Sequence, residues 1–123
     1  MARTNVPYSS LLPNSDVADP AGTATNAGVG NGHVIAKAHP ELTLLRVVAG
    51  STGGNVTIKA GANPPAIAAG QGDLVIAVAN NATRWIGPLE SGRFIQADGS
   101  LLVDIAVGFV AGTITAFKIP RNT

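Results

Sequence analysis

His33 and His39 are the only histidines in the 123 residues, and imidazole is the side chain best suited to metal binding or general-base chemistry near neutral pH. The two residues lie six positions apart across a predicted short strand, each near a glycine or a proline. This spacing does not match a histidine pair that binds a metal from one element. We therefore interpret both as structural histidines on loop edges, and the sequence predicts no metal site.

Carboxylates are the next candidates, because a pair of them can hydrolyse a glycosidic bond. Asp98 and Asp104 flank a predicted strand, while Asp73 and Glu90 lie on predicted loops. The Asp-Gly turn explains Asp98, and a glycine-flanked loop explains Asp73. Aromatic residues make up only 4% of the chain, which leaves little to stack on a sugar. The chain also has no Gly-x-Ser-x-Gly motif to activate a serine. We therefore expect no enzymatic activity and no cofactor.

Gly28, Gly30 and Gly32 resemble part of a phosphate-binding loop in their spacing. Such a loop follows a strand and begins a helix. Pro20 precedes these glycines and the short run 34–36 follows them, so neither element is predicted. We interpret the segment as an irregular loop.

The stretch "WIGPLESGRFIQADGSL" (85–101) contains the only tryptophan and two opposite charges, Glu90 and Arg93. One interpretation is a corner between two strands that a salt bridge or a backbone clamp fixes. The other is a charged contact with a neighbouring subunit. Trp85 is open to two interpretations as well, a cap on the aliphatic core or an interface anchor.

The elements that must position these residues are short strands. In "NVTIKA" (55–60), apolar and polar residues alternate with a period of two, which is typical of a half-buried strand. The turn at 51–54 predicts a hairpin between this strand and "LTLLRVVAG" (42–50). Asp98-Gly99 predicts a second hairpin, between "RFIQA" (93–97) and "SLLVDIAV" (100–107), whose Leu101, Val103, Ile105 and Val107 share one face.

The other segments extend the same pattern. "LVIAVA" (74–79) is a nearly continuous apolar strand that we expect to be covered on both faces. The prolines in "GANPPAIAAGQGD" (61–73) predict a connection across an end of the sheet. Asn80-Asn81 predicts a turn into "ATRWIG" (82–87), and "TITAFKI" (113–119) closes the chain. The sequence therefore predicts an all-β domain over residues 23–123, an antiparallel β-sandwich or small, jelly-roll-like barrel of about eight short, mostly sequentially paired strands.

Residues 1–22 contain Pro7, Pro13 and Pro20, which disfavour a helix. Tyr8, Leu11 and Leu12 are apolar residues in this otherwise polar segment. We predict an extended N-terminal arm that packs on a partner. On this interpretation, deletion of residues 1–20 leaves the β domain folded and weakens its attachment.

Charge and composition limit the partners. Charged residues are only 12% of the chain and the net charge is +1, which argues against nucleic acid as a partner. No apolar run reaches transmembrane length, and we expect no membrane partner. A charge-poor surface rich in alanine and glycine suits a protein that other proteins cover.

The runs "LLRVVAGSTGGNVTIKAG" and "GQGDLVIAVANNATRWIGPLESGRFIQADGSLLVDIAVGFVAGTITAF" resemble small all-β structural proteins of tailed bacteriophages. The resemblance covers about residues 42–117. It implies a virion protein on the capsid surface, assembled in the host cytoplasm, that decorates and cements the shell. The partner it implies is the major capsid protein, and the implied assembly is a homo-oligomer, with a trimer favoured. The alternatives are a structural protein of the tail, head–tail joint or fibre, or a surface module that binds a carbohydrate or receptor.

No residue roles follow from this resemblance, so the candidate partner contacts come from the residues themselves. They are side chains of the arm and of the tryptophan-containing corner: Arg3, Tyr8, Leu11, Leu12, Arg84, Trp85, Glu90 and Arg93.

Overall fold

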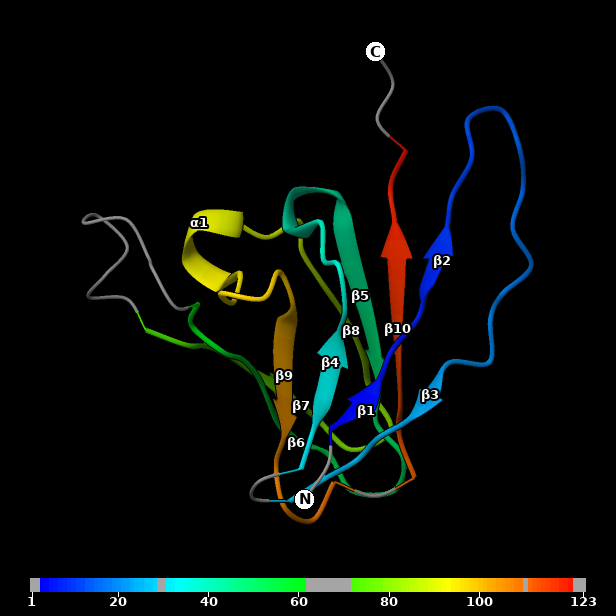
Figure 1. Cartoon of the computed structure of the whole chain (residues 1–123). Helices are drawn as coiled ribbons and strands as arrows, with labels where there is room; N and C mark the ends of the chain where they lie inside the picture. The colour runs from blue at the N-terminus through cyan, green and yellow to red at the C-terminus, as the bar shows by residue number, and fades with distance from the viewer. Residues whose placement is uncertain (1–2, 29–30, 62–71, 110, 121–123) are drawn as a thin grey trace.

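The computed structural model describes residues 3–28, 31–61, 72–109 and 111–120, and they form two β-sheets with one shared core (Figure 1). The first sheet has the order β1-β4-β9-β6-β7. Its strands are β1 (Thr4–Asn5), β4 (His33–Ile35), β9 (Leu101–Ile105), β6 (Gly54–Ile58) and β7 (Leu74–Val78).

The second sheet has the order β2-β10-β5-β8, and β3 also pairs with β10. Its strands are β2 (Tyr8–Ser10), β10 (Thr113–Lys118), β5 (Thr43–Val48), β8 (Thr83–Ile86) and β3 (Thr23–Ala24). Two short helices complete the described elements, the 3-10 helix η1 (Pro40–Leu42) and α1 (Ser91–Phe94). The all-β prediction is confirmed, and the two sheets do not close into a barrel.

Both sheets are mixed, not purely antiparallel as predicted. The strands of the N-terminal segment supply the parallel pairs: β1 runs parallel to β4, and β2 runs parallel to β10. The remaining pairs are antiparallel. The physical reason is that β1 and β2 enter the sheets as added edge strands and not through tight turns.

The core lies between the sheets and follows the period-two pattern of the sequence. Leu45 and Val47 of β5 point inward from the second sheet, and Val56 and Ile58 of β6 point inward from the first. The intervening residues of both strands are more exposed. Small aliphatic side chains make up most of this core, with Phe94 and Phe109 as aromatic members.

The predicted sequential pairing of strands is wrong for most of the chain. β5 and β6 do not form a hairpin, because β5 pairs with β10 and β8 while β6 pairs with β7 and β9. The turn at 51–54 instead takes the chain from one sheet to the other. Asn80-Asn81 is a turn as predicted, with Asn81 at a positive φ of 58°, but it too connects strands of different sheets.

The predicted hairpin at Asp98-Gly99 is also wrong. A turn is present, because the Gly99 amide donates to the Gln96 carbonyl at 2.9 Å and the Gln96 amide donates to the Ser100 carbonyl at 2.8 Å. However, residues 91–94 form α1 and not a strand. β9 therefore pairs with β4 and β6 and not with the segment that precedes the turn. Leu101, Val103 and Ile105 face the core as predicted, whereas Val107 lies beyond β9 and is 74% exposed.

Two further expectations concern residues 61–79. β7 is an edge strand with exposed residues and is not covered on both faces. The path of the proline-containing connection lies outside the described residues for positions 62–71.

The tryptophan-containing stretch requires a glycine at position 87. Its φ is +125°, and a β-carbon there would lie 2.4 Å from the Thr43 carbonyl oxygen. Any other residue would clash with β5 at this point. The chain therefore leaves β8 at Gly87, next to Pro88, as the sequence predicted for the end of this strand.

Candidate partner-binding surfaces

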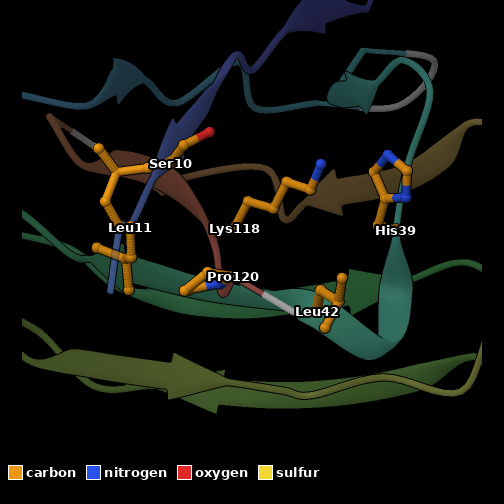
Figure 2. A pocket seen from close by; sticks show the side chains of 7 residues that line it. Ser10, Leu11, His39, Leu42, Lys118 and Pro120 are labelled. Atoms are coloured by element: carbon orange, nitrogen blue, oxygen red, sulfur yellow. The ribbon is translucent and has the colours of Figure 1, made fainter. Parts of the chain in front are cut away.

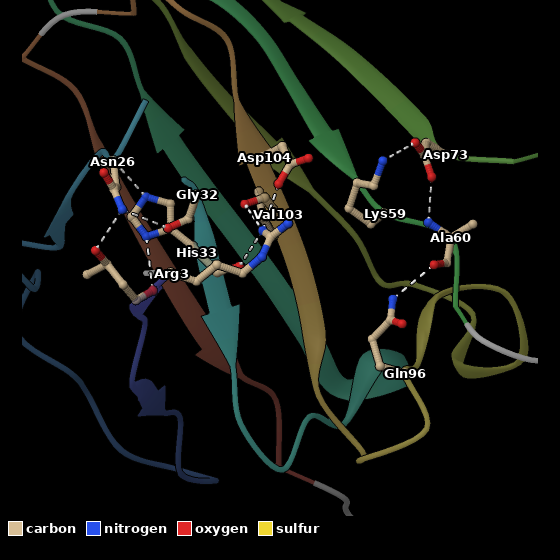
Figure 3. A network of polar contacts seen from close by, with 11 residues as sticks. Arg3, Asn26, Gly32, His33, Lys59, Ala60, Asp73, Gln96, Val103 and Asp104 are labelled. Carbon is tan, nitrogen blue, oxygen red and sulfur yellow. Dashed lines mark hydrogen bonds and ion pairs between the residues drawn. The ribbon is translucent and has the colours of Figure 1, made fainter. Parts of the chain in front are cut away.

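Arg3 is bound within its own molecule and does not project to a partner. Its guanidinium lies 2.7 Å from a carboxylate oxygen of Asp104 and donates to the carbonyls of His33 and Val103 at 3.3 and 3.2 Å (Figure 3). These contacts join the start of the chain to β4 and β9. Arg3 therefore anchors the start of the described chain to the first sheet, and its contact with a partner stays a prediction.

His33 is fully buried beneath this anchor, not on a loop edge, and is a structural residue as interpreted. Its Nε2 accepts a hydrogen bond from the Asn26 amide at 3.0 Å, and its Nδ1 lies 3.3 Å from the Thr4 carbonyl. This pair of contacts fits a neutral ring with the proton on Nδ1. Burial lowers the pKa of His33 below its usual value; the Thr4 hydrogen bond opposes that shift, and the charge of Arg3 adds to it.

Tyr8 fastens β2 to the second sheet. Its hydroxyl lies 2.6 Å from the hydroxyl of Thr43 and accepts a hydrogen bond from the His39 amide at 2.9 Å. The ring is half-buried and 6.2 Å from the His39 ring. Tyr8 thus holds the arm in place, and only part of it faces outward.

Residues 11–22, which we call the strap, connect β2 to β3 and extend away from the sheets (Figure 1). Residues 12–19 are all exposed, and Leu12 is 62% exposed. The strap is fixed at both ends. The Leu11 amide donates to the Lys118 carbonyl at 2.9 Å, and Arg46 forms an ion pair with Asp19 and donates to the Pro20 carbonyl at 2.9 Å.

A hollow of about 540 Å³ opens beside the base of the strap (Figure 2). Most of its wall is apolar, and its two basic side chains are Lys118 and His39. The lining residues are Ser10, Leu11, Leu12, His39, Leu42, Lys118 and Pro120. The predicted contacts Leu11 and Leu12 thus lie together at one concave surface, which suits an apolar side chain with a carboxylate nearby.

Trp85 lies on the outer face of the second sheet and is 55% exposed. Its ring stacks on Phe117, with centroids 5.6 Å apart and planes 28° apart. The guanidinium carbon of Arg46 is 5.8 Å from the centre of the Trp85 ring and 5.6 Å from that of Phe117. The Trp85 ring thus packs on the buried Phe117 and is also exposed enough to anchor a partner, so both interpretations of Trp85 stay predictions. Arg84, the neighbouring candidate, is also exposed.

The corner around Glu90 and Arg93 is a backbone clamp. Glu90 precedes α1, and its carbonyl accepts from the amides of Arg93 and Phe94 at 3.3 and 3.2 Å. The Arg93 side chain lies over the Phe94 ring and donates to the Gly72 carbonyl at 3.2 Å. The Gly61 amide donates to the Arg93 carbonyl at 2.7 Å. Arg93 thus ties the ends of β6 and β7 to α1, while the Glu90 side chain is exposed.

Three of the four carboxylates that were weighed for catalysis, Asp73, Asp98 and Asp104, have a structural contact. Asp73 pairs with Lys59 at 2.8 Å and accepts from the Ala60 amide at 2.6 Å (Figure 3). These contacts, with the Lys59 hydrogen bond the largest, lower the pKa of Asp73. Asp98 accepts from the amide and hydroxyl of Ser100, which lowers its pKa. Within the described parts of the chain, no three metal-ligating side chains gather at one point.

Among the helices of the described residues, none has the length and apolar character needed to cross a bilayer. Comparisons of the chain with protein-family models, with curated proteins and with solved structures gave no match.

Arg46 and Lys118 are the functional candidates that sequence reasoning missed. Arg46 is the only charge in the apolar run of β5, at a position whose neighbours Leu45 and Val47 are buried. A charge at this alternating position signals an outward-facing residue on a strand. Its aromatic neighbours come from β8 and β10, and no local pattern indicates that pairing.

Proposed function

We propose that this chain is a virion structural protein of a tailed bacteriophage that decorates the capsid surface and stabilises the shell by binding across its subunits. The resemblance of residues 42–117 is one support. The partner is then the major capsid protein, and the chain acts as a homo-oligomer, with three copies favoured. At the level of fold, we propose that the two sheets form a jelly-roll-like sandwich whose strap reaches a neighbour.

The main support for the proposal is the exposed strap together with the hollow beside its base. A decoration protein must present apolar side chains to a partner without losing its own fold. Leu12 and Val17 are exposed on a strap whose two ends are fastened to the sheets. Because both ends are fixed, the strap loses less conformational entropy on binding than a free tail would.

The exposed aromatic and basic side chains fit a protein partner better than a sugar. Of the five aromatic residues, Phe94, Phe109 and Phe117 are buried and Tyr8 is half-buried. Trp85 is then the one strongly exposed ring in the described residues, which is too few to line a sugar-binding groove. The basic pair Lys118 and His39 suits an acidic residue on the shell.

The location of the protein in purified particles tests this function. We expect mass spectrometry to find the chain in mature virions and cryo-electron microscopy to show its density on the outer shell. Density confined to the tail, or virions without the chain, would overturn the proposal.

A binding variant tests the surface. Leu12→Asp places a charge where we expect an apolar contact, and its affinity for particles that lack the protein should fall at least tenfold, about 1.4 kcal/mol. Val107→Asp is the matched control, because Val107 is equally apolar and exposed but lies on the loop after β9. Equal affinities of the two variants would show that the strap is not the contact.

A further inference from the structure

β7 is an edge strand with an unpaired side. It forms the end of the first sheet and pairs with β6 along all five of its residues. Among the described residues 3–28, 31–61, 72–109 and 111–120, no strand pairs with its other side. An edge of this kind presents a row of backbone donors and acceptors that a further strand can use.

The side chains of β7 add an apolar surface to this edge. Val75 is 54% exposed and Ala77 is exposed, and both lie opposite the polar face of β6 at Thr57 and Asn55. No charged residue occurs from Leu74 to Thr83. The strand therefore offers both backbone groups and apolar side chains to a partner.

Other edges carry the devices that proteins use against unwanted strand pairing, namely charges and prolines. Arg3 and Pro7 flank β1, Pro7 also precedes β2, and Arg84 lies within β8. Asp73 directly precedes β7, but the strand itself and the residues after it as far as Thr83 carry neither a proline nor a charge. Among the edge strands of the described residues, β7 is the longest, and it has no such device of its own.

We propose that β7 pairs antiparallel with β7 of a second copy of this chain, so that two five-stranded sheets join into one. An uncharged strand is complementary to itself. In the antiparallel arrangement, Asp73 lies toward the partner's Asn80 end and away from the partner's Asp73, whereas a parallel arrangement would bring the two carboxylates together. This contact specifies one interface of the homo-oligomer in the proposed function. It rests on the proposed function only in assuming that the chain associates with itself.

The symmetry of the contact fixes the copy number. A two-fold strand pair gives two copies, and a separate three-fold contact would raise the number to six. A five-residue strand pair alone buries less than the roughly 1,200 Å² of a stable interface. We therefore expect this contact to dissociate on dilution, so that it joins single copies into dimers or, with the three copies favoured above, trimers into hexamers.

Sedimentation velocity on the isolated full chain over a range of concentrations tests this contact. We expect a concentration-dependent dimer, or a hexamer, for the native chain. Val75→Lys should weaken association at least tenfold, because it places like charges across the joint. Val107→Lys, the same change at an exposed valine elsewhere, should leave association unchanged.

Two further measurements separate lost association from lost folding. Val75→Lys and Val75→Glu should each lack the β7 contact when alone and should associate through it when mixed, since opposite charges then meet directly or diagonally across the joint. Hydrogen exchange should slow at amides of Leu74–Val78 in the native oligomer and quicken in Val75→Lys, while Leu101–Ile105 of the central strand β9 stays protected in both. A native chain that stays at one or at three copies up to the highest concentration, or unchanged association of Val75→Lys, would overturn the contact. None of these results bears on where the protein lies in the virion, so failure here is distinguishable from failure of the proposed function.

Discussion

At the scale of single residues, His33 shows how a candidate for chemistry serves the fold. Both ring nitrogens are committed to backbone groups of two segments, the Thr4 carbonyl and the Asn26 amide. A second proton would turn Nε2 from acceptor into donor and break the contact with Asn26. The neutral ring is therefore the form that can make both contacts at once, to Thr4 of β1 and to Asn26 after β3.

This arrangement predicts a pH dependence of stability. The unfolded chain binds a proton at the ordinary histidine pKa of about 6.5, whereas burial lowers the pKa of folded His33. Between the two values the unfolded state holds more protons, so the free energy of unfolding falls as pH drops from about 6.5 toward the folded pKa. Below the folded pKa this residue causes no further loss.

Urea unfolding at pH 7.5, 6.5 and 5.5 measures this slope. His33→Gln should unfold more easily at every pH and should lose the part of the slope that His33 causes. His39→Gln, at the exposed histidine, should keep it. If His33→Gln retains the full slope, His33 is not its source.

At the scale of elements, the N-terminal segment belongs to both sheets. β1 joins the first sheet and β2 joins the second, and Val6 between them is buried in the core at 1% exposure. The Thr4 and Val6 amides donate to the carbonyls of Gly32 and Val34, each at 2.9 Å. These residues thus connect the two sheets along one side, and within residues 3–22 the strap is the part that extends outward.

Val6→Ala tests this role of the segment. It removes two methyl groups from the core, and the free energy of unfolding should fall by about 1–3 kcal/mol. Val107→Ala removes the same atoms from an exposed position and should change stability by less than about 0.5 kcal/mol. Chemical denaturation compares the two, and equal losses would mean that the arm is not part of the core.

At the scale of the whole molecule, fold and attachment reside in different parts of the N-terminal segment. The expectation that deletion of residues 1–20 leaves the domain folded needs correction. That deletion removes β1, β2 and Val6, and with them the Arg3 ion pair to Asp104. We now expect the shortened chain to unfold or to lose most of its stability. The division of the chain at residue 22 into arm and domain stays a prediction.

Replacement of residues 12–18 by glycine and serine of equal length separates the two roles. The replaced residues are exposed, so the melting curve should change little, by about 1 kcal/mol or less in stability. Binding to particles that lack the protein should fall, because Leu12 and Val17 are gone. Full binding by this variant would show that the attachment site lies outside the strap.

The sequence alone was enough for the all-β character, the alternating core faces of β6 and β9, and the turns at Asn80-Asn81 and Asp98-Gly99. These follow from period-two patterning and turn chemistry, which act between neighbours in the chain. The tertiary structure decided which strands pair. A turn signal shows that the chain reverses, but not whether the next strand lies about 4.8 Å away in the same sheet or about 10 Å away across the core.

The same limit applied to the candidate contacts. Arg3 and Arg93 are basic residues whose sequence context looks exposed, yet their partners are backbone carbonyls far along the chain. Leu11 and Leu12 were found from the sequence because they stand out in a polar segment, but the hollow beside them needs Leu42 and Pro120 as well. The chemical character of each side chain could be read from the sequence. Whether Arg3 is held inside the molecule and Trp85 is exposed depends on contacts between segments that are far apart in the chain, and these contacts exist only in the folded structure.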